Sequence, residues 1–169
     1  FYLLMWVVFY KYIYLHKYLY ILRKNFKVIT SKIRNKVFFT MAKKITRTKL
    51  VKKLDSIFSK YIRQVNSINE IATCFTCGKK DHWKKLQNGH FQSRRHYSTR
   101  WNELNCQVQC SGCNIFKSGE QFKFSQNLDK KFGKGTAQEL QQIANQTIKF
   151  SSFELEEKII KYENLVNQL

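Results

Sequence analysis

The chain has 169 residues, which is enough for one modest domain with its own core. Its 31 Lys and Arg residues against 11 Asp and Glu residues give a formal net charge of +20, which favours a polyanionic partner: nucleic acid first, an anionic membrane second. Five cysteines, an odd number, argue against an oxidised extracellular scaffold, and we expect a cytoplasmic protein in which some thiols bind a metal.

Residues 1–40 differ in composition from the rest of the chain. They hold 12 of the 26 aromatic residues and eight Lys or Arg residues, but no Asp or Glu. The first ten residues are apolar, whereas a membrane-spanning helix needs about 20. We interpret residues 1–40 as an extension upstream of an ordinary polar start at Met41, translated from non-coding sequence. The alternative is a basic amphipathic segment on a membrane surface. For residues 41–169 we expect no membrane contact.

Residues 41–71 contain a basic amphipathic pattern that predicts a helix over roughly 47–69. The apolar positions at helical spacing are Leu50, Leu54, Ile57, Phe58, Tyr61, Ile62 and Val65. Lys52 and Lys53 lie on the remaining faces. These lysines either form a solvated face or contact phosphates, depending on whether the helix adjoins the functional site, and the pattern leaves both alternatives open.

Residues 72–118 have no sustained periodicity and contain all five cysteines, whereas residues 119–169 return to helical spacing. In the latter, Gly133 is a plausible end of one helix. Thr136 and Ser151 are each followed by Glu at the third position, which predicts capping boxes that open two further helices. We therefore expect an α+β fold in which a small irregular core is flanked by α-helices.

Two C-x-x-C pairs predict a structural metal centre. They are formed by Cys74, Cys77, Cys110 and Cys113. A two-residue spacing allows one tight turn to direct both thiolates at one ion, and two such turns complete a tetrahedral sulfur shell, which favours zinc. A closed shell of four thiolates leaves no position for a substrate. Cys106 lies four residues before Cys110, so we interpret it as a packed thiol whose role stays open.

Three further residues around these pairs resemble, in order and spacing, the motif of HNH (His-Me finger) nucleases with zinc knuckles. His90 lies between the two pairs, Asn105 lies five residues before Cys110, and Asn114 directly follows Cys113. The resemblance implies a zinc-stabilised ββα core with His90 on the first strand of a hairpin and Asn114 on the following helix.

The chemistry of phosphodiester hydrolysis gives each of these residues a role. An imidazole can deprotonate the attacking water, so His90 is the candidate general base. The amide oxygen of Asn105 would accept from the imidazole N–H and fix its tautomer. Asn114 would offer an oxygen to a catalytic magnesium or manganese ion. The expected phosphate contacts are Arg94, Arg95, Arg100 and Lys117, with Lys52 and Lys53 on the basic helix.

Each residue also has a simpler reading that the sequence leaves open. The alternative to catalysis is that His90 is a satisfied surface or core histidine, Asn105 a turn residue and Asn114 a helix cap. The segment SRRHYSTR is then a solvated loop.

Gly89 also departs from the wider HNH pattern, because many such nucleases have an Asp before the His as a metal ligand. Asn88, Glu103 and Glu120 are alternatives for that ligand, and a shell made mainly of phosphate and water oxygens is another.

The stretch from about Lys49 to Tyr162 resembles the phage lambda NinG (Rap) recombination protein family. The segments that carry the resemblance occur in order as KLVKKLDSIFSKYIR, CFTCGK, GHFQSRRH, QCSGCN, LDKKFG and GTAQEL. The resemblance implies a structure-selective endonuclease that cuts branched DNA such as Holliday junctions and D-loops, encoded by a phage or prophage and acting in the bacterial cytoplasm. Two cuts per junction make a homodimer an expectation. The alternative is a non-catalytic zinc module that binds DNA or RNA.

Overall fold

The structure is a computed structural model that describes residues 45–169, so the interpretation of residues 1–40 lies outside the described range. Residues 46–169 form one compact unit. In chain order its helices and strands are α2 (Arg47–Val65), β1 (Ser67–Ile68), β2 (Ile71–Thr73), β3 (Lys80–His82), β4 (Gln87–His90), β5 (Cys106–Gln109), α3 (Gln121–Phe132), α4 (Thr136–Ala144) and α5 (Ser152–Asn167). This mixture of helices with small antiparallel sheets confirms the α+β class. No helix in the described part is both long and apolar enough to cross a membrane.

The basic amphipathic helix is present, but it ends four residues earlier than expected. Helix α2 stops at Val65, and Ser67 and Ile68 instead form β1, which pairs with β2. The two residues between these strands, Asn69 and Glu70, both adopt left-handed backbone conformations with φ of 49° and 64°. Two consecutive residues in this conformation form the tight turn of a β-hairpin. The chain therefore leaves the helix before residue 69.

The C-terminal helices begin and end near the predicted positions. Helix α3 ends at Phe132, directly before Gly133, whose φ of 114° is favoured by glycine. The capping box at Ser151 is confirmed. The one at Thr136 is wrong: Thr136 is already the first helical residue, and its hydroxyl donates to the carbonyl of Gly133.

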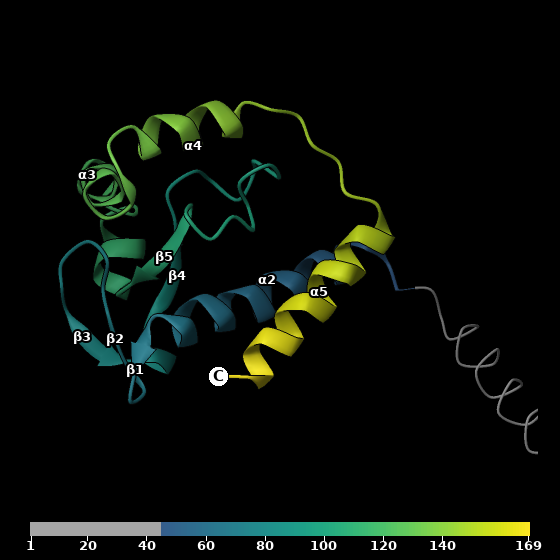
Figure 1. The fold of residues 1–169 in the computed structure, drawn as a ribbon, viewed down its shortest axis with the longest axis horizontal. Helices are drawn as coiled ribbons and strands as arrows, with labels where there is room; N and C mark the ends of the chain where they lie inside the picture. The colour runs from purple at the N-terminus through teal and green to yellow at the C-terminus, as the bar shows by residue number, and fades with distance from the viewer. Residues whose placement is uncertain (1–44) are drawn as a thin grey trace, which may run out of the picture. The chain divides into compact units, whose positions relative to one another are not determined.

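The hairpin of β4 and β5 lies between two sets of helices (Figure 1). Side chains alternate along a strand, so successive residues of β5 point to opposite faces of the hairpin. Val108 belongs to the core that α2 and α5 share, whereas Gln107 accepts a hydrogen bond from Lys131 of α3. Helix α2 therefore covers one face of the hairpin, and α3 covers the other.

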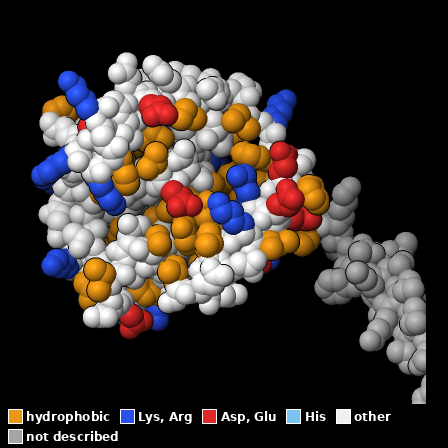
Figure 2. Space-filling view, in the orientation of Figure 1, with side chains coloured by type: hydrophobic (Ala, Val, Ile, Leu, Met, Phe, Trp, Pro, Cys, Tyr) orange, Lys and Arg blue, Asp and Glu red, His pale blue; other side chains and the backbone are white. Residues whose placement is uncertain are grey.

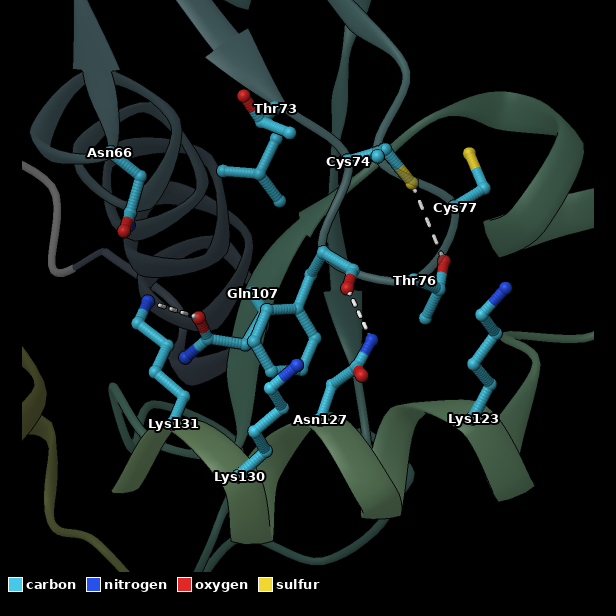
Figure 3. A pocket seen from close by; sticks show the side chains of 13 residues that line it. Asn66, Thr73, Cys74, Thr76, Cys77, Gln107, Lys123, Asn127, Lys130 and Lys131 are labelled. Atoms are coloured by element: carbon cyan, nitrogen blue, oxygen red, sulfur yellow. Dashed lines mark hydrogen bonds between the residues drawn. The ribbon is translucent and has the colours of Figure 1, made fainter. Parts of the chain in front are cut away.

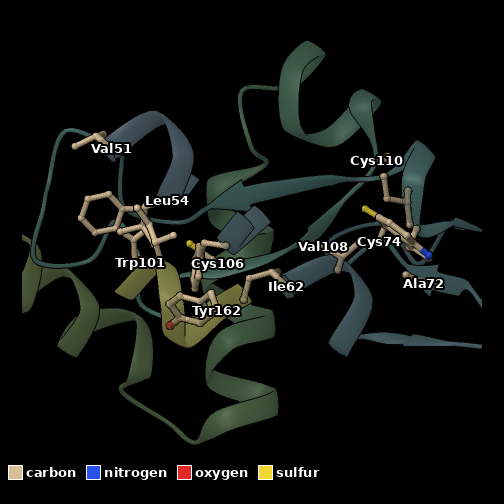
Figure 4. Packing of buried hydrophobic residues seen from close by; sticks show 14 of the residues in the cluster. Val51, Leu54, Ile62, Ala72, Cys74, Trp101, Cys106, Val108, Cys110 and Tyr162 are labelled. Atoms are coloured by element: carbon tan, nitrogen blue, oxygen red, sulfur yellow. The ribbon is translucent and has the colours of Figure 1, made fainter. Parts of the chain in front are cut away.

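The main core extends along α2 (Figure 4). Leu54, Phe58 and Ile62 are at most 2% exposed, and Tyr162 of α5 packs edge-on against Phe58 at 4.8 Å between ring centroids. Burying a side chain of this size contributes about 1.5–3 kcal/mol. A second, smaller cluster on the α3 side consists of Phe124, Leu128 and Leu140. Both faces of the hairpin are therefore anchored by buried side chains.

Candidate metal centre and hairpin site

The four cysteines of the two C-x-x-C pairs lie together. Their Sγ atoms are all within 4.8 Å of one another, and the Sγ atoms of Cys77 and Cys110 are 3.7 Å apart. A tetrahedral zinc site with Zn–S bonds of about 2.3 Å requires S···S separations of about 3.8 Å. The first knuckle turns at Gly78, which has a φ of 77°. The geometry confirms the predicted four-cysteine cluster, which fits a metal such as zinc.

Polar groups behind the sulfur atoms support this cluster. Thr76 Oγ1 lies 3.4 Å from Cys74 Sγ, and Gln109 of β5 donates to the same hydroxyl and to the carbonyl of Gly119. Burial raises the pKa of the Cys74 thiol, but hydrogen bonds from Thr76 and from neighbouring backbone groups outweigh burial and bring it to about 6. At Cys74 this environment favours the thiolate, which is the form that binds a metal, whereas the pKa of the Cys77 and Cys113 thiols is raised.

Cys106 lies outside the cluster. Its side chain is fully buried on β5, and its Sγ donates to the carbonyl of Arg100 at 3.6 Å. Burial strongly raises the pKa of its thiol. These features agree with the packed thiol expected from its spacing.

His90 is the last residue of β4, and its side chain faces α2. Its Nε2 atom lies 3.1 Å from the carbonyl oxygen of Arg100. Since a carbonyl can only accept, the ring hydrogen lies on Nε2 and the lone pair lies on Nδ1. The ring lines a small cavity of about 40 Å³ together with Asp55, Asn88 and Arg94. The site thus combines an oriented imidazole, a carboxylate, an amide and an exposed guanidinium.

Burial, followed by the positive charge of Arg94, lowers the pKa of His90 from 6.5 to about 4. The carbonyl of Arg100 and the carboxylate of Asp55 act in the opposite direction but do not compensate. The imidazole is therefore neutral at pH 7, which is the form that can accept a proton.

This shift predicts a pH-dependent stability. Between pH 6.5 and 4 the unfolded chain binds a proton at His90 that the folded protein does not, so the free energy of unfolding falls as the pH is lowered. Because a tenfold change in proton affinity corresponds to about 1.4 kcal/mol, the loss approaches about 3 kcal/mol near pH 4. Urea unfolding of the wild type and of His90→Gln, from pH 7.5 to 4.5, measures this loss in the free energy of unfolding. The variant should lose less stability than the wild type; a constant difference between the two proteins contradicts the expected shift. Acid release of the metal affects both proteins and cancels in the comparison.

The expected contact between Asn105 and the imidazole of His90 is wrong. The Asn105 amide oxygen accepts from the backbone N–H of Gln92 at 2.6 Å, and its Nδ2 donates to the carbonyls of Gln92 and Thr99 at 3.0 Å each. Asn105 is fully buried. It therefore holds the two ends of the loop between β4 and β5 together, and the backbone of Arg100 orients His90 in its place.

The expected convergence of His90 and Asn114 is also wrong. Asn114 lies in the short π-helix Gly112–Phe116, and its Nδ2 donates to Gln87 Oε1 at 2.7 Å. Gln87 and His90 are three residues apart on β4, so their side chains leave opposite faces of the strand. The carboxamide of Asn114 and the imidazole of His90 consequently lie across the hairpin from each other.

The side chains near Asn114 do not complete a shell for magnesium or manganese. Gly89 has no side-chain donor, and a Cβ atom there would overlap the amide oxygen of Gln109. Of the other expected ligands, Glu120 pairs with Lys117 at 2.9 Å, and Glu103 accepts from two tyrosine hydroxyls. The oxygen of Asn88 is buried without a partner, but it lies on the His90 side of β4. The catalytic metal therefore stays a prediction.

The predicted phosphate contacts divide into free and occupied side chains. Arg94 and Arg95 are exposed on the loop after β4. Arg100 instead forms a bidentate pair with Asp55 at 2.6 and 2.9 Å, with only 16% of its side chain exposed. The carboxylate raises the pKa of the Arg100 guanidinium. Arg100 therefore connects the loop to α2, and as a DNA contact it is unsuitable.

The lysines predicted to contact phosphates also divide into those paired with a carboxylate and one that is exposed. Lys117 pairs with Glu120, and Lys53 pairs with Glu163 at 2.8 Å, whereas Lys52 is exposed. Figure 2 shows that Lys and Arg side chains are dispersed around the edge of one face, with a pair near its centre. The positive charge on this face is therefore spread out and does not form a single patch.

Asp55 is the residue of this site that sequence reasoning missed. It is the one acidic residue of α2, and it accepts from both Arg100 and Trp101 Nε1. A signal was present, because Asp55 directly follows Leu54 on the apolar side of a helix rich in lysine. A carboxylate at such a position requires a partner.

A protein-family model described as Bacteriophage Lambda NinG protein matches residues 23–169. The match covers most of the chain and begins upstream of Met41. No curated protein and no solved structure matches the chain.

Proposed function

The chain belongs to the family of the Bacteriophage Lambda NinG protein, and on that premise we propose that it acts on DNA in phage recombination, as an endonuclease that cuts branched molecules such as Holliday junctions and D-loops. The observation that carries the proposal is the state of His90. Its ring hydrogen on Nε2 is held by the carbonyl of Arg100, which leaves the lone pair on Nδ1, and burial keeps the ring neutral at pH 7. Those are the requirements for a general base.

In the proposed reaction, Nδ1 of His90 removes a proton from a water molecule that attacks the scissile phosphate. Arg94 lines the same cavity and binds a phosphate oxygen. A bound phosphate also places negative charge beside the imidazole, which raises the pKa of His90 again and makes it a stronger base. Asn105 and the Arg100–Asp55 pair maintain the loop that positions these groups.

The requirement for magnesium or manganese is part of the proposal. Such an ion would stabilise the negative charge that develops on the phosphate and on the leaving oxygen. Asn114 does not hold this ion, because its carboxamide lies across the hairpin from the imidazole of His90. A homodimer is proposed for the same substrate, because complete resolution of a four-way junction needs two cuts.

A labelled four-way junction tests this function directly. The zinc-loaded protein is incubated with the junction, a linear duplex of the same sequence and a structured RNA, each with magnesium, with manganese or with EDTA. We expect metal-dependent cleavage of the junction and little cleavage of the other two. A protein that binds the junction but leaves it intact with either metal contradicts the nuclease assignment, and equal affinity for all three molecules contradicts selectivity for branched DNA.

The second candidate is a zinc module that binds DNA or RNA without cutting it. Two observations favour it: Gln109 occupies the space of a side chain at position 89, and the hairpin separates His90 from Asn114. In this alternative the imidazole is a structural group that connects β4 to the loop.

A further inference from the structure

An open groove lies between the first cysteine knuckle and α3 (Figure 3). Its volume is about 750 Å³, and it lies on the α3 side of the hairpin, across β4 and β5 from His90. Asn127 Nδ2 donates to the carbonyl of Phe75 at 2.6 Å, which ties the helix to the knuckle across the groove. The position of α3 relative to the knuckle is therefore fixed by a direct contact.

Apart from the cysteines of the metal centre, the charged side chains of the groove are all positive. Lys123, Lys130 and Lys131 line it, and no Asp or Glu does. Within residues 45–169, none of these three lysines has a carboxylate within 4.0 Å. Lys131 instead approaches the amide oxygen of Gln107 at 3.4 Å and lies over the Phe75 ring. Three lysines without acidic partners favour the binding of an anionic ligand.

The spacing of these lysines suits a phosphate chain. Lys123 and Lys130 are seven residues apart on α3, which corresponds to about 10 Å along the helix axis. One strand of a duplex carries a phosphate about every 3.4 Å of its axis, so this interval spans roughly three phosphates. The amide of Asn66 lines the same groove and donates one N–H to the carbonyl of Ile62, so its second N–H can donate to a phosphate or sugar oxygen.

We propose that this groove binds the backbone of one DNA strand, at a site separate from Arg94 and His90. The inference rests on the proposed action on DNA. It also adds a reason for selectivity: phosphate contacts on both faces of the hairpin engage two arms of a branched molecule, whereas a single linear duplex engages one face at a time.

A competing explanation is that the lysines balance the charge of the metal centre. Four thiolates around a divalent ion leave a net negative charge, and Cys74 and Cys77 line the groove. Figure 3 shows, however, that Lys123 lies near Cys77, whereas Lys130 and Lys131 lie toward the other end of the groove, near Asn66 and Gln107. Balancing the thiolate charge therefore explains the position of Lys123 better than the positions of Lys130 and Lys131.

The test compares two zinc-loaded full-length variants with equal loss of charge. One carries Lys123→Gln, Lys130→Gln and Lys131→Gln. The control carries Lys85→Gln, Lys149→Gln and Lys161→Gln, which are exposed lysines outside the groove. Binding of a fluorescent four-way junction and of a structured RNA is measured at several salt concentrations. We expect the groove variant to bind at least about tenfold more weakly, with a salt slope reduced by about 2–3, and the control to change much less.

Several outcomes overturn the proposal. Equal weakening in both variants means that net charge alone matters. A loss of bound zinc with unchanged junction affinity assigns the lysines to the metal, and a selective loss of RNA affinity assigns the groove to RNA. If the triple variant is unstable, the double variant Lys123→Gln/Lys130→Gln decides, because both side chains are exposed. A groove effect in a protein that never cuts supports the groove while refuting the nuclease, so the two proposals fail separately.

Discussion

Replacing His90 with Gln should lower the rate of junction cleavage by about 10²–10⁴-fold, the contribution typical of a positioned general base. Gln can still donate to the carbonyl of Arg100, which now accepts from the imidazole, but it has no lone pair basic enough to take a proton from water. Affinity for the junction and the melting temperature at pH 7.5 should change little. Single-turnover cleavage with saturating protein separates the chemical step from binding.

His96→Gln is the matched control for this variant. His96 lies in the same loop, and its Nδ1 contacts the carbonyl of Ala144 at 2.8 Å, so it too orients a backbone segment. If His96→Gln reduces cleavage as strongly as His90→Gln, the loop is merely perturbed and the general-base role is wrong. Unchanged cleavage by His90→Gln leads to the same conclusion.

Replacing Cys113 with Ser should abolish cooperative folding of residues 46–169. Three of the four cluster cysteines are also part of the main core, and Cys113 is only 3% exposed. A serine oxygen is a poor substitute for a thiolate at a zinc ion, and structural zinc contributes about 10–16 kcal/mol of binding free energy, which is larger than the usual stability of a domain. Circular dichroism during heating, together with the zinc content per chain, measures the loss.

Cys106→Ser is the control for the loss of a buried thiol. Its hydroxyl can donate to the carbonyl of Arg100 as the thiol does, and its side chain lies outside the cluster. We expect one zinc per chain and a melting transition close to that of the wild type. A folded, zinc-free Cys113→Ser protein would show that the core is stable without the metal. Loss of zinc from Cys106→Ser would place that residue in the metal site.

The sequence by itself determined the features that depend on short-range spacing. Two residues between cysteines are enough to direct both thiolates at one ion, the period of α2 identifies its buried side, and Ser151 with Glu154 closes a capping box within one turn. The partners in each of these features are separated by only a few residues, and the two knuckles lie close enough together to share one metal ion. Local geometry therefore leaves few alternatives.

Only the tertiary structure decided the partners of His90, Asn105, Asn114 and Arg100. Asn114 bonds to Gln87, 27 residues away, and Arg100 bonds to Asp55, 45 residues away. Whether a strand residue faces α2 or α3 depends on which helix covers which face, and the spacing of a motif does not contain that information. The physical reason is that a polar side chain bonds to whichever group packing brings within reach, and in this protein long-range packing places the hairpin between two helices.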